Sequence, residues 1–301
     1  MNQNLSRRTF LAVGAITPFA IVDGAHARQA SPAATPGTPI TTEGDTQLTI
    51  DANKALVAEA TNAFFNQHDA AAVDRFIGET YVQHSALVAD GRDAFRDFIA
   101  SLGEGVAYEN VRLLGDGDLV AAHGRYTGFG EPPLVGIDIF RVAGGKLVEH
   151  WDGLQPEAEP NPSGHTMLDG PAEVTQPDQT EASRQVAEAF VDAVLIGGQY
   201  DRLPEFVSTE AYIQHNPQIA DGLDGLGVAV QALADQGISM VYNARHRTIA
   251  EGEFVLVQSD GDFVRPVIYN DLFRIVDGKI VEHWDVIQDQ VSDLPHNNGQ
   301  F

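Results

Sequence analysis

The four-residue string Glu-His-Trp-Asp occurs twice in this chain, and this recurrence constrains the fold more than any other feature. The string occupies positions 149–152 and returns at positions 282–285. Each copy directly follows a Gly-Lys pair and two apolar residues. The chain therefore contains two copies of one sequence pattern.

Further landmarks recur in the same order and at nearly the same spacing. The motif Tyr-x-Gln-His at 81–84 returns 131 positions later at 212–215, and Asp-x-Phe-Arg at 138–141 returns 133 positions later at 271–274. A period above a hundred residues exceeds the roughly 20 to 50 residues of a solenoid repeat and matches a whole small domain. The sequence therefore predicts a tandem duplication of one domain.

Composition agrees with two globular units and excludes several classes of function. The 301 residues are 43% hydrophobic, and no unbroken apolar run is long enough to cross a bilayer. Only 18 basic residues face 43 acidic ones, for a net charge of -25, which disfavours nucleic acid as a partner and favours solubility. Cysteine is absent, so catalysis must come from histidine, carboxylates, tyrosine or a bound ion.

The first residues match an export signal. Arg7 and Arg8 stand before Phe-Leu and a mildly apolar stretch at 12–22, which ends in an Ala-x-Ala pattern at Ala27. This pattern is typical of a twin-arginine signal peptide, here residues 1–27. We expect a flexible linker at 28–47 and a mature protein that is periplasmic or extracellular and not held in a membrane.

Apolar periodicity predicts helices followed by strands in each unit. The first unit, 48–160, has expected helices at 52–67, 69–77 and 91–102 and expected strands at 106–114, 119–127, 134–142 and 146–154. The second unit, 181–301, has expected helices at 181–195, 202–207 and 223–236 and expected strands at 239–249, 254–259, 265–276 and 279–287. Residues 161–180, rich in Pro, Gly, Glu and Asp, read as a linker. The order predicts two α+β units.

The motifs of both units, Tyr-x-Gln-His, Asp-Gly before the third helix, Asp-x-Phe-Arg and Gly-Lys-x-Val-Glu-His-Trp-Asp, resemble those of the SnoaL-like branch of the nuclear transport factor 2-like superfamily. The resemblance implies a cone-shaped unit, in which a curved antiparallel sheet wraps around N-terminal helices and encloses a mostly apolar pocket. Members include polyketide cyclases, ketosteroid isomerases, epoxide hydrolases, dehydratases and ligand binders without activity, so the fold alone does not name a reaction.

The resemblance has three further implications. It makes the carboxylate near the end of the last strand a candidate general base, which falls on Asp152 and Asp285. It lets the C-terminal segment at 297–299 fold over a pocket mouth. Because single-unit members commonly pair through the outer face of the sheet, it also predicts an intrachain pseudo-dimer, with a homo-oligomer of whole chains left open.

Strand geometry nominates site residues independently of the resemblance. Side chains alternate across a strand, so His150 and Asp152 share one face while Glu149 and Trp151 share the other. The neighbouring strand adds Asp138 to the first pair, which gives an imidazole flanked by carboxylates. His84 is expected to reach the same cavity from the helical side. The equivalent candidates of the second unit are His215, Asp271, His283 and Asp285.

Each candidate also has a structural interpretation. A strand histidine is more often a core or interface residue than a catalyst, and recurrence follows from descent alone. Tyr81 and Tyr212 read as core anchors, and Trp151 and Trp284 as packing residues. Two histidines and one aspartate form a possible metal face, but no His-x-x-x-His pair supports it, so neither a metal nor a cofactor is expected.

Three functions remain open. The first is an exported cyclase, aldolase or isomerase in which Asp285 or Asp152 takes a proton alpha to a carbonyl while His283 or His150 polarises the oxygen. The second is a non-catalytic extracytoplasmic binder of a small apolar ligand. The third is a scaffold with both units packed shut. A catalytic Asp or His should have a pKa far from its ordinary value, whereas a residue that only lines a binding pocket need not, so a shifted pKa would distinguish the first function from the second. A cavity of several hundred cubic ångströms would exclude the third function.

The two units are not expected to be equivalent. His123 of the first unit is replaced by Gln258 in the second. The second unit also has His246 and the 297–299 segment, which makes it the stronger candidate for activity.

Overall fold

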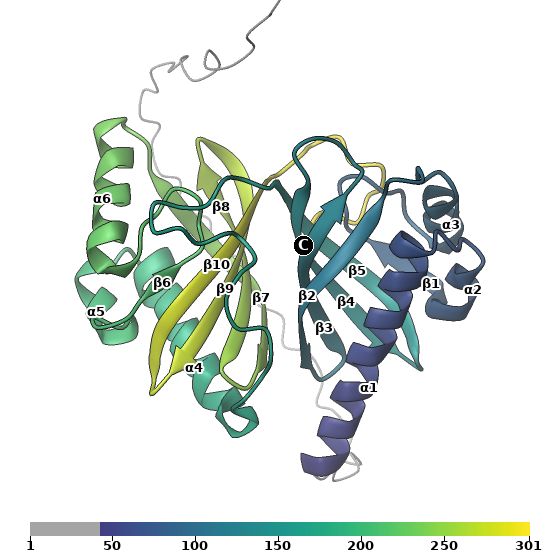
Figure 1. Ribbon diagram of the computed structural model, residues 1–301, viewed down its shortest axis with the longest axis horizontal. Coiled ribbons are helices and arrows are strands. Elements are labelled where there is room, and N and C mark those ends of the chain that lie inside the picture. Colours follow the sequence, from purple (N-terminus) through teal and green to yellow (C-terminus); the bar gives the residue numbers. More distant parts are fainter. Residues whose placement is uncertain (1–42) are drawn as a thin grey trace, which may run out of the picture. The chain divides into compact units, whose positions relative to one another are not determined.

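Two five-stranded sheets with the same strand order make up most of the fold (Figure 1). The computed structural model describes residues 43–301, so the expected signal at 1–27 and most of the 28–47 linker lie outside the described residues. The first sheet has the order β1-β5-β4-β3-β2, and the second has β6-β10-β9-β8-β7. The predicted α+β class is confirmed. Among the described residues, no helix is long and apolar enough to span a membrane.

The first half places its helices before and between its strands. Its elements are α1 (Glu43–Thr61), η1 (Asn62–Asn66), α2 (Ala72–Phe76), β1 (Ile77–Gln83), α3 (Arg92–Ala100), β2 (Ala107–Asp116), β3 (Leu119–Thr127), β4 (Leu134–Ala143) and β5 (Lys146–Pro156). The four long strands lie where the sequence predicts them. The first three residues of the Tyr-x-Gln-His motif at 81–84 form the end of a further strand, β1.

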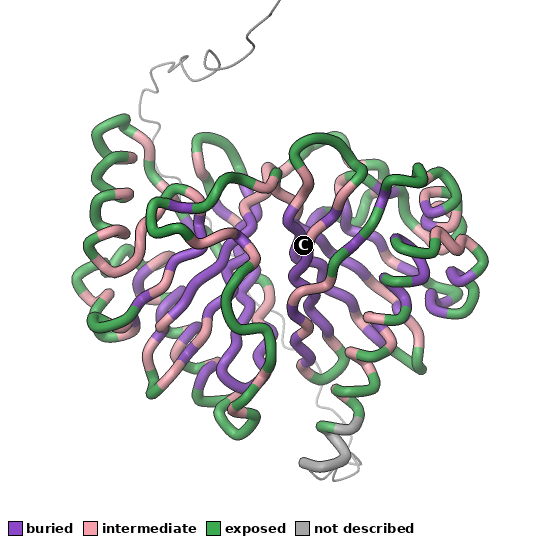
Figure 2. Tube along the Cα trace, in the orientation of Figure 1, coloured by how far each residue is buried: buried purple, intermediate pink, exposed green. Residues whose placement is uncertain are grey.

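The second half repeats this order with shorter early elements. They are η2 (Pro177–Gln179), α4 (Thr180–Phe190), η3 (Val191–Ile196), η4 (Tyr200–Arg202), α5 (Leu203–Phe206), β6 (Ile213–Gln214), α6 (Gly222–Asp235), β7 (Met240–Glu251), β8 (Phe254–Phe263), β9 (Arg265–Val276) and β10 (Lys279–Asp289). α3 buries Phe95 and Ile99, whereas its counterpart α6 has no fully buried residue (Figure 2).

The prediction of purely antiparallel sheets is wrong at one strand of each sheet. β1 pairs with β5 in parallel, with Gln83 opposite His150, and β6 pairs with β10 in parallel, with Gln214 opposite His283. The other pairs are antiparallel. Parallel pairing needs a long crossover, and here α3 and three strands separate β1 from β5. This pairing brings Gln83 beside a candidate site histidine.

Each sheet buries both faces, but against different partners. The helix-facing side of the first sheet joins an apolar cluster that includes Phe64, Phe95 and Ile99. The opposite side joins a cluster shared by both halves, which contains Trp151 and Trp284. Alternation of side chains along β5 accounts for this division, because Trp151 and His150 must point in opposite directions. The tryptophans are therefore packing residues, as expected.

Two arginines make matching contacts across the shared cluster. The guanidinium of Arg112 in β2 lies 4.3 Å from the ring centroid of Trp284, and that of Arg247 in β7 lies 3.7 Å from the ring of Trp151. A desolvated cation–π contact contributes about 2 kcal/mol. Because each half supplies an arginine to the tryptophan of the other, the contact is reciprocal.

The segments that follow the two last strands cross between the halves. Asn161, after β5, donates from Nδ2 to the backbone oxygen of Ile219 at 2.9 Å. Asn298, after β10, donates to the backbone oxygen of Gln83 at 2.9 Å and to Asp90 Oδ1 at 2.7 Å (Figure 1). The expectation that 297–299 covers the second unit's own pocket is therefore wrong, since this segment lies on the first half.

Candidate functional site

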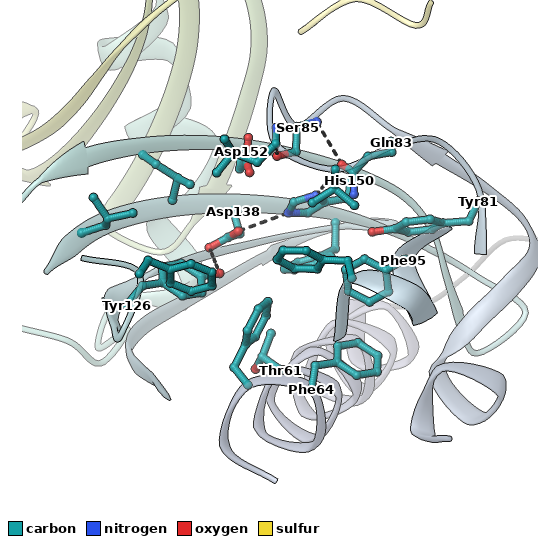
Figure 3. Close-up of a pocket in the computed structure, with 18 residues that line it drawn as sticks. Thr61, Phe64, Tyr81, Gln83, Ser85, Phe95, Tyr126, Asp138, His150 and Asp152 are labelled. Atoms are coloured by element: carbon teal, nitrogen blue, oxygen red, sulfur yellow. Dashed lines mark hydrogen bonds and ion pairs between the residues drawn. The ribbon is translucent and has the colours of Figure 1, made fainter. Parts of the chain in front are cut away.

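Three predicted site residues of the first half converge on the helix-facing side of the sheet (Figure 3). Asp138 on β4 lies directly opposite Asp152 on β5, and His150 stands two residues before Asp152. All three are at most 8% exposed. His150 Nε2 lies 3.1 Å from Asp138 Oδ1, and one ligand atom of each residue lies within 4.8 Å of the others. Strand parity placed these side chains correctly.

Gln83 determines which nitrogen of His150 holds its proton. The Oε1 atom of Gln83 accepts the backbone N–H groups of His84 at 3.0 Å and Ser85 at 2.9 Å, so it acts as an acceptor. His150 Nδ1, 2.8 Å from the same oxygen, must therefore donate. Nε2 then shares a proton with Asp138, whose other oxygen accepts the hydroxyl of Tyr126 at 2.9 Å. Nε2 is the exchangeable position.

The surroundings of Asp152 make its carboxylate a stronger base than an exposed one. Burial raises the pKa of Asp152 above its usual range, and although His150 opposes this rise, the charge of Asp138 adds to it. Ser85 and His296 also oppose the rise, the first by a hydrogen bond and the second by its charge. A carboxylate with a raised pKa takes a proton more readily than an exposed one, which suits a general base.

Tyr81 presents a hydroxyl that no other described group uses. Its oxygen is buried and lacks a hydrogen-bond partner of ordinary geometry among the described residues. Burial raises the pKa of Tyr81, Asp152 and Asp138 raise it further, and nearby Gln83 opposes the rise. The hydroxyl therefore stays protonated and is available as a donor.

A cavity of about 50 Å³ lies beside these groups. Its apolar lining residues, several of them drawn in Figure 3, are Phe64, Phe65, Leu87, Val88, Phe95, Phe98, Phe129, Leu134, Phe140 and Leu154. Leu87 is 63% exposed and Phe129 is 40% exposed, so the rim is apolar as well. The volume accommodates a few water-sized groups and is below the several hundred cubic ångströms that would exclude the scaffold interpretation.

The second half repeats the hydrogen-bond pattern. His283 Nε2 lies 3.0 Å from Asp271 Oδ1, and its Nδ1 lies 3.1 Å from Gln214 Oε1. Burial lowers the pKa of His283, but the hydrogen bond and charge of Asp271 outweigh it and raise that pKa overall. Burial also raises the pKa of Asp285, whose Oδ2 accepts Asn216 Nδ2 at 2.7 Å.

A tyrosine fills space beside the second trio. Gly136 stands two residues before Asp138 on the same face of β4, and Tyr269 holds the matching position before Asp271. The Tyr269 ring is fully buried and stacks on Tyr242 with centroids 4.0 Å apart. The described cavity of about 50 Å³ borders the first trio, and the expectation that the second unit is the stronger candidate for activity stays a prediction.

The expectation that His84 and His215 reach these trios is wrong. His84 Nε2 bonds Glu149 Oε1 at 3.0 Å, and its ring stacks on Trp151 at 4.9 Å. His215 likewise stacks on Trp284 at 4.5 Å. Each follows a glutamine that points to the helix-facing side, so alternation sends the histidine to the opposite side. His246 pairs with Asp260 and stacks on the C-terminal residue, away from both trios.

Sequence reasoning missed four contributors to the site. Gln83 and Gln214 orient the histidines, and Tyr81 and Tyr126 surround Asp138 and His150 with hydroxyl groups. The recurrence of the Tyr-x-Gln-His motif in both halves could have pointed to the glutamines and Tyr81, but it was used only to align the two copies. Pairing between β1 and β5 was needed to see that its glutamine meets the histidine of Glu-His-Trp-Asp.

Comparison with known proteins identifies part of the chain. The model of the SnoaL-like domain matches residues 58–150, so the first half contains a SnoaL-like domain. No curated protein matches the chain.

Three solved structures illustrate the likeness. TsrD from Streptomyces laurentii is 20% identical, covering 35% of this chain and 89% of that one, with a TM-score of 0.30. An NTF2-like protein of unknown function from Mesorhizobium loti is 19% identical, covering 35% and 93%, with a TM-score of 0.32. An LEH-like epoxide hydrolase from M. tuberculosis is 18% identical, covering 36% and 85%, with a TM-score of 0.31. At such identities the likeness concerns the fold and not the reaction.

Proposed function

We propose that the first half moves a proton on a small, largely apolar carbonyl compound, as an isomerase or cyclase does. The observation that carries this proposal is the convergence of three kinds of group on one apolar cavity. These are the buried base Asp152, the hydrogen-bonded pair Asp138–His150, and the Tyr81 hydroxyl, which lacks a hydrogen-bond partner of ordinary geometry among the described residues. A base and donors in apolar surroundings are what enolate formation requires.

The proposed step divides the work between these groups. Asp152 takes a proton from the carbon alpha to the carbonyl, so a C–H bond breaks and an O–H bond forms on the carboxyl group. The electron pair enters the enolate, and the oxygen accepts a hydrogen bond from Tyr81 or from the His150–Asp138 pair. Return of the proton to a different carbon of a conjugated enolate completes isomerisation. Attack of the enolate carbon on a second carbonyl of the same molecule breaks that C=O π bond, and the resulting alkoxide takes the proton from Asp152, which completes cyclisation. General base catalysis contributes about 10²–10⁴-fold.

Exchange of alpha protons with deuterated water tests this proposal before a natural substrate is known. Small ketones and enones, such as acetone, cyclopentanone and cyclohexenone, are incubated with the protein and followed by proton NMR. We expect at least one to exchange faster than in buffer, and Asp152→Asn to slow that exchange by about 10²–10⁴-fold. Asp285→Asn, the matched change in the second half, should leave it unaltered. Equal exchange by wild type and Asp152→Asn would contradict the proposal.

Binding without turnover is the second candidate, and one observation favours it. The Asp–His–Asp trio is repeated in the second half, where its residues line neither described cavity, so the trio by itself does not imply turnover. In that case the first-half cavity and its apolar rim would hold a ligand that Asp152→Asn still binds, with no exchange of its protons. Ligand titration of wild type and Asp152→Asn followed by NMR separates the two candidates.

We also propose that the two halves arose by tandem duplication and pair as an intrachain pseudo-dimer. The identical strand orders, the matching trios and the reciprocal Arg112 and Arg247 contacts support this.

Export through the twin-arginine route is a further proposal, supported by Arg7 and Arg8. A reporter that folds in the cytoplasm, fused after residue 47, should be exported, and Arg7→Lys with Arg8→Lys should retain it inside the cell. Unchanged export of that variant would count against the signal.

A further inference from the structure

We propose that His165, Asp169 and His215 form a binding site for a divalent transition-metal ion of the zinc type. His165 and Asp169 belong to the crossing segment after β5, whereas His215 follows β6. Asp169 Oδ1 lies 2.8 Å from His215 Nδ1, and Asp169 Oδ2 lies 3.6 Å from His165 Nδ1. One donor atom of each residue lies within 4.8 Å of the others.

Small movements of the side chains would bring these donors to the spacing of a tetrahedral site. Zinc bonds of about 2.0–2.1 Å place tetrahedral ligand atoms about 3.4 Å apart. The side chains of His165 and Asp169 are 30% and 44% exposed, so solvent leaves room for such movements. Two imidazoles and one carboxylate are a donor set that zinc accepts, with a water molecule as the fourth ligand.

Both histidines are oriented as metal ligands usually are. His165 Nε2 lies 3.1 Å from Asp221 Oδ2, and His215 Nε2 lies 2.9 Å from Glu282 Oε1. Metal-bound histidines almost always donate the other ring N–H to such a group, which fixes the tautomer and directs the lone pair at the ion. Glu282 is itself held by Arg274 Nε at 2.7 Å. In both rings Nδ1 therefore remains for the metal.

The crossing segment is held firmly at this point. The backbone oxygen of Asp169 accepts Arg112 Nη2 at 2.5 Å and Trp284 Nε1 at 2.9 Å. Gly170 has a φ of 93°, and a Cβ there would lie 2.7 Å from Glu282 Oε1. The segment therefore comes close to His215 and Glu282 because this position has no side chain.

Metal binding would replace a present contact of His215. Its Nδ1 also lies 2.8 Å from the backbone oxygen of Thr166. Because ligand atoms must be deprotonated to bind an ion, metal affinity should fall as pH falls. No His-x-x-x-His pair marks this site in the sequence, since its ligands come from two segments about 50 residues apart.

Cobalt provides the direct test, since its visible absorption reports the ligand field and zinc displaces it. The mature chain is stripped with a chelator and titrated with Co²⁺, then with Zn²⁺ in a calorimeter. We expect one ion per chain. His165→Ala should lower affinity by more than about 100-fold, and Asp221→Asn by about 10–100-fold, the usual cost of a lost outer partner. Zinc should also raise the unfolding temperature of wild type but not of His165→Ala.

The chain offers matched controls. His84 has the same tryptophan stacking and glutamate bond in the first half, and its Nδ1 likewise faces a backbone oxygen, that of Gly299 at 3.0 Å. Among the described residues, however, His84 belongs to no cluster of three possible metal ligands. His84→Gln should therefore leave metal affinity unchanged. Asp152→Asn and Asp285→Asn should do the same. Absence of stoichiometric binding, or wild-type affinity in His165→Ala, would overturn the proposal. Loss of binding in Asp152→Asn or Asp285→Asn would also overturn it, since the ion would then occupy a trio.

Discussion

His150 and His283 each have one nitrogen with a fixed proton and one that faces a carboxylate. The fixed proton depends on a glutamine oxygen that also accepts two backbone N–H groups, as Gln83 does from His84 and Ser85. A glutamine turned by half a rotation would lose all three hydrogen bonds. The protonation pattern of the site is therefore built into the backbone of the segment after β1.

The substitution Tyr81→Phe should slow the proposed proton exchange without destabilising the protein. The hydroxyl of Tyr81 is buried without a partner among the described residues, so its removal should leave the free energy of unfolding unchanged or raise it by about 1 kcal/mol. Loss of a donor to the enolate oxygen should slow proton exchange by about 10²–10³-fold. Tyr212→Phe is the control, because Tyr212 accepts Gln214 Nε2 at 3.1 Å and its loss should destabilise the protein. Urea unfolding and exchange NMR measure both effects.

The raised pKa of Asp152 predicts how stability depends on pH. Burial makes the folded state hold this proton more tightly than the unfolded chain, so the stability from this group is complete below its ordinary pKa of 3.8. It is lost as pH rises through the raised folded pKa. Asp152→Asn should therefore be relatively more stable than wild type above that pH. Urea unfolding at a series of pH values checks this, and a constant difference from wild type would speak against it.

At the scale of elements, both halves pack a tyrosine pair against the sheet, but one tyrosine of the pair comes from different strands. In the first half Tyr126 of β3 packs with Tyr108, and a Cβ at Gly136 of β4 would lie 2.9 Å from the Tyr126 ring. In the second half Tyr269 of β9 stacks on Tyr242, and its hydroxyl donates to the backbone oxygen of Asp262 at 3.2 Å.

Tyr269→Ala should open space beside Asp271. Removal of a buried aromatic ring typically costs about 3–5 kcal/mol of stability, which urea unfolding measures. The emptied volume should bind small apolar compounds such as benzene or xenon, seen as NMR shifts of residues in β9. If the variant loses this stability without gaining such binding, then the neighbouring side chains have collapsed into the space and Tyr269 is not what closes the second site.

At the scale of the whole described chain, the halves are joined by their sheets and by exchanged segments. The shared cluster buries Ile137, Ile139 and Trp151 from the first half against Leu256, Leu272 and Trp284 from the second. His296 and Asn298 of the C-terminal segment bond the backbone after β1, next to the first trio. Each half therefore contributes buried side chains, and the C-terminal segment contributes hydrogen bonds, to the environment of the other half.

Separation of the halves should expose this apolar face. A fragment of residues 43–170 would present Trp151 and its neighbours to water, and a second copy of the fragment offers the most similar surface to cover them. We expect a homodimer or insoluble protein, measured by analytical ultracentrifugation. Trp151→Ala in the fragment should weaken self-association. A well-folded monomeric fragment would show that the shared cluster is dispensable.

Local patterns in the sequence are sufficient for several features. Periodicity predicted the eight long strands and most helices, and strand parity divided Glu149 and Trp151 from His150 and Asp152, because alternation depends only on neighbouring residues. The parallel pairing of β1, the swapped terminal segments and the positions of His84 and His215 were decided by contacts between residues far apart in sequence. The packing of Tyr269 on Tyr242 was decided in the same way, since the space that a ring fills depends on what packs across from it.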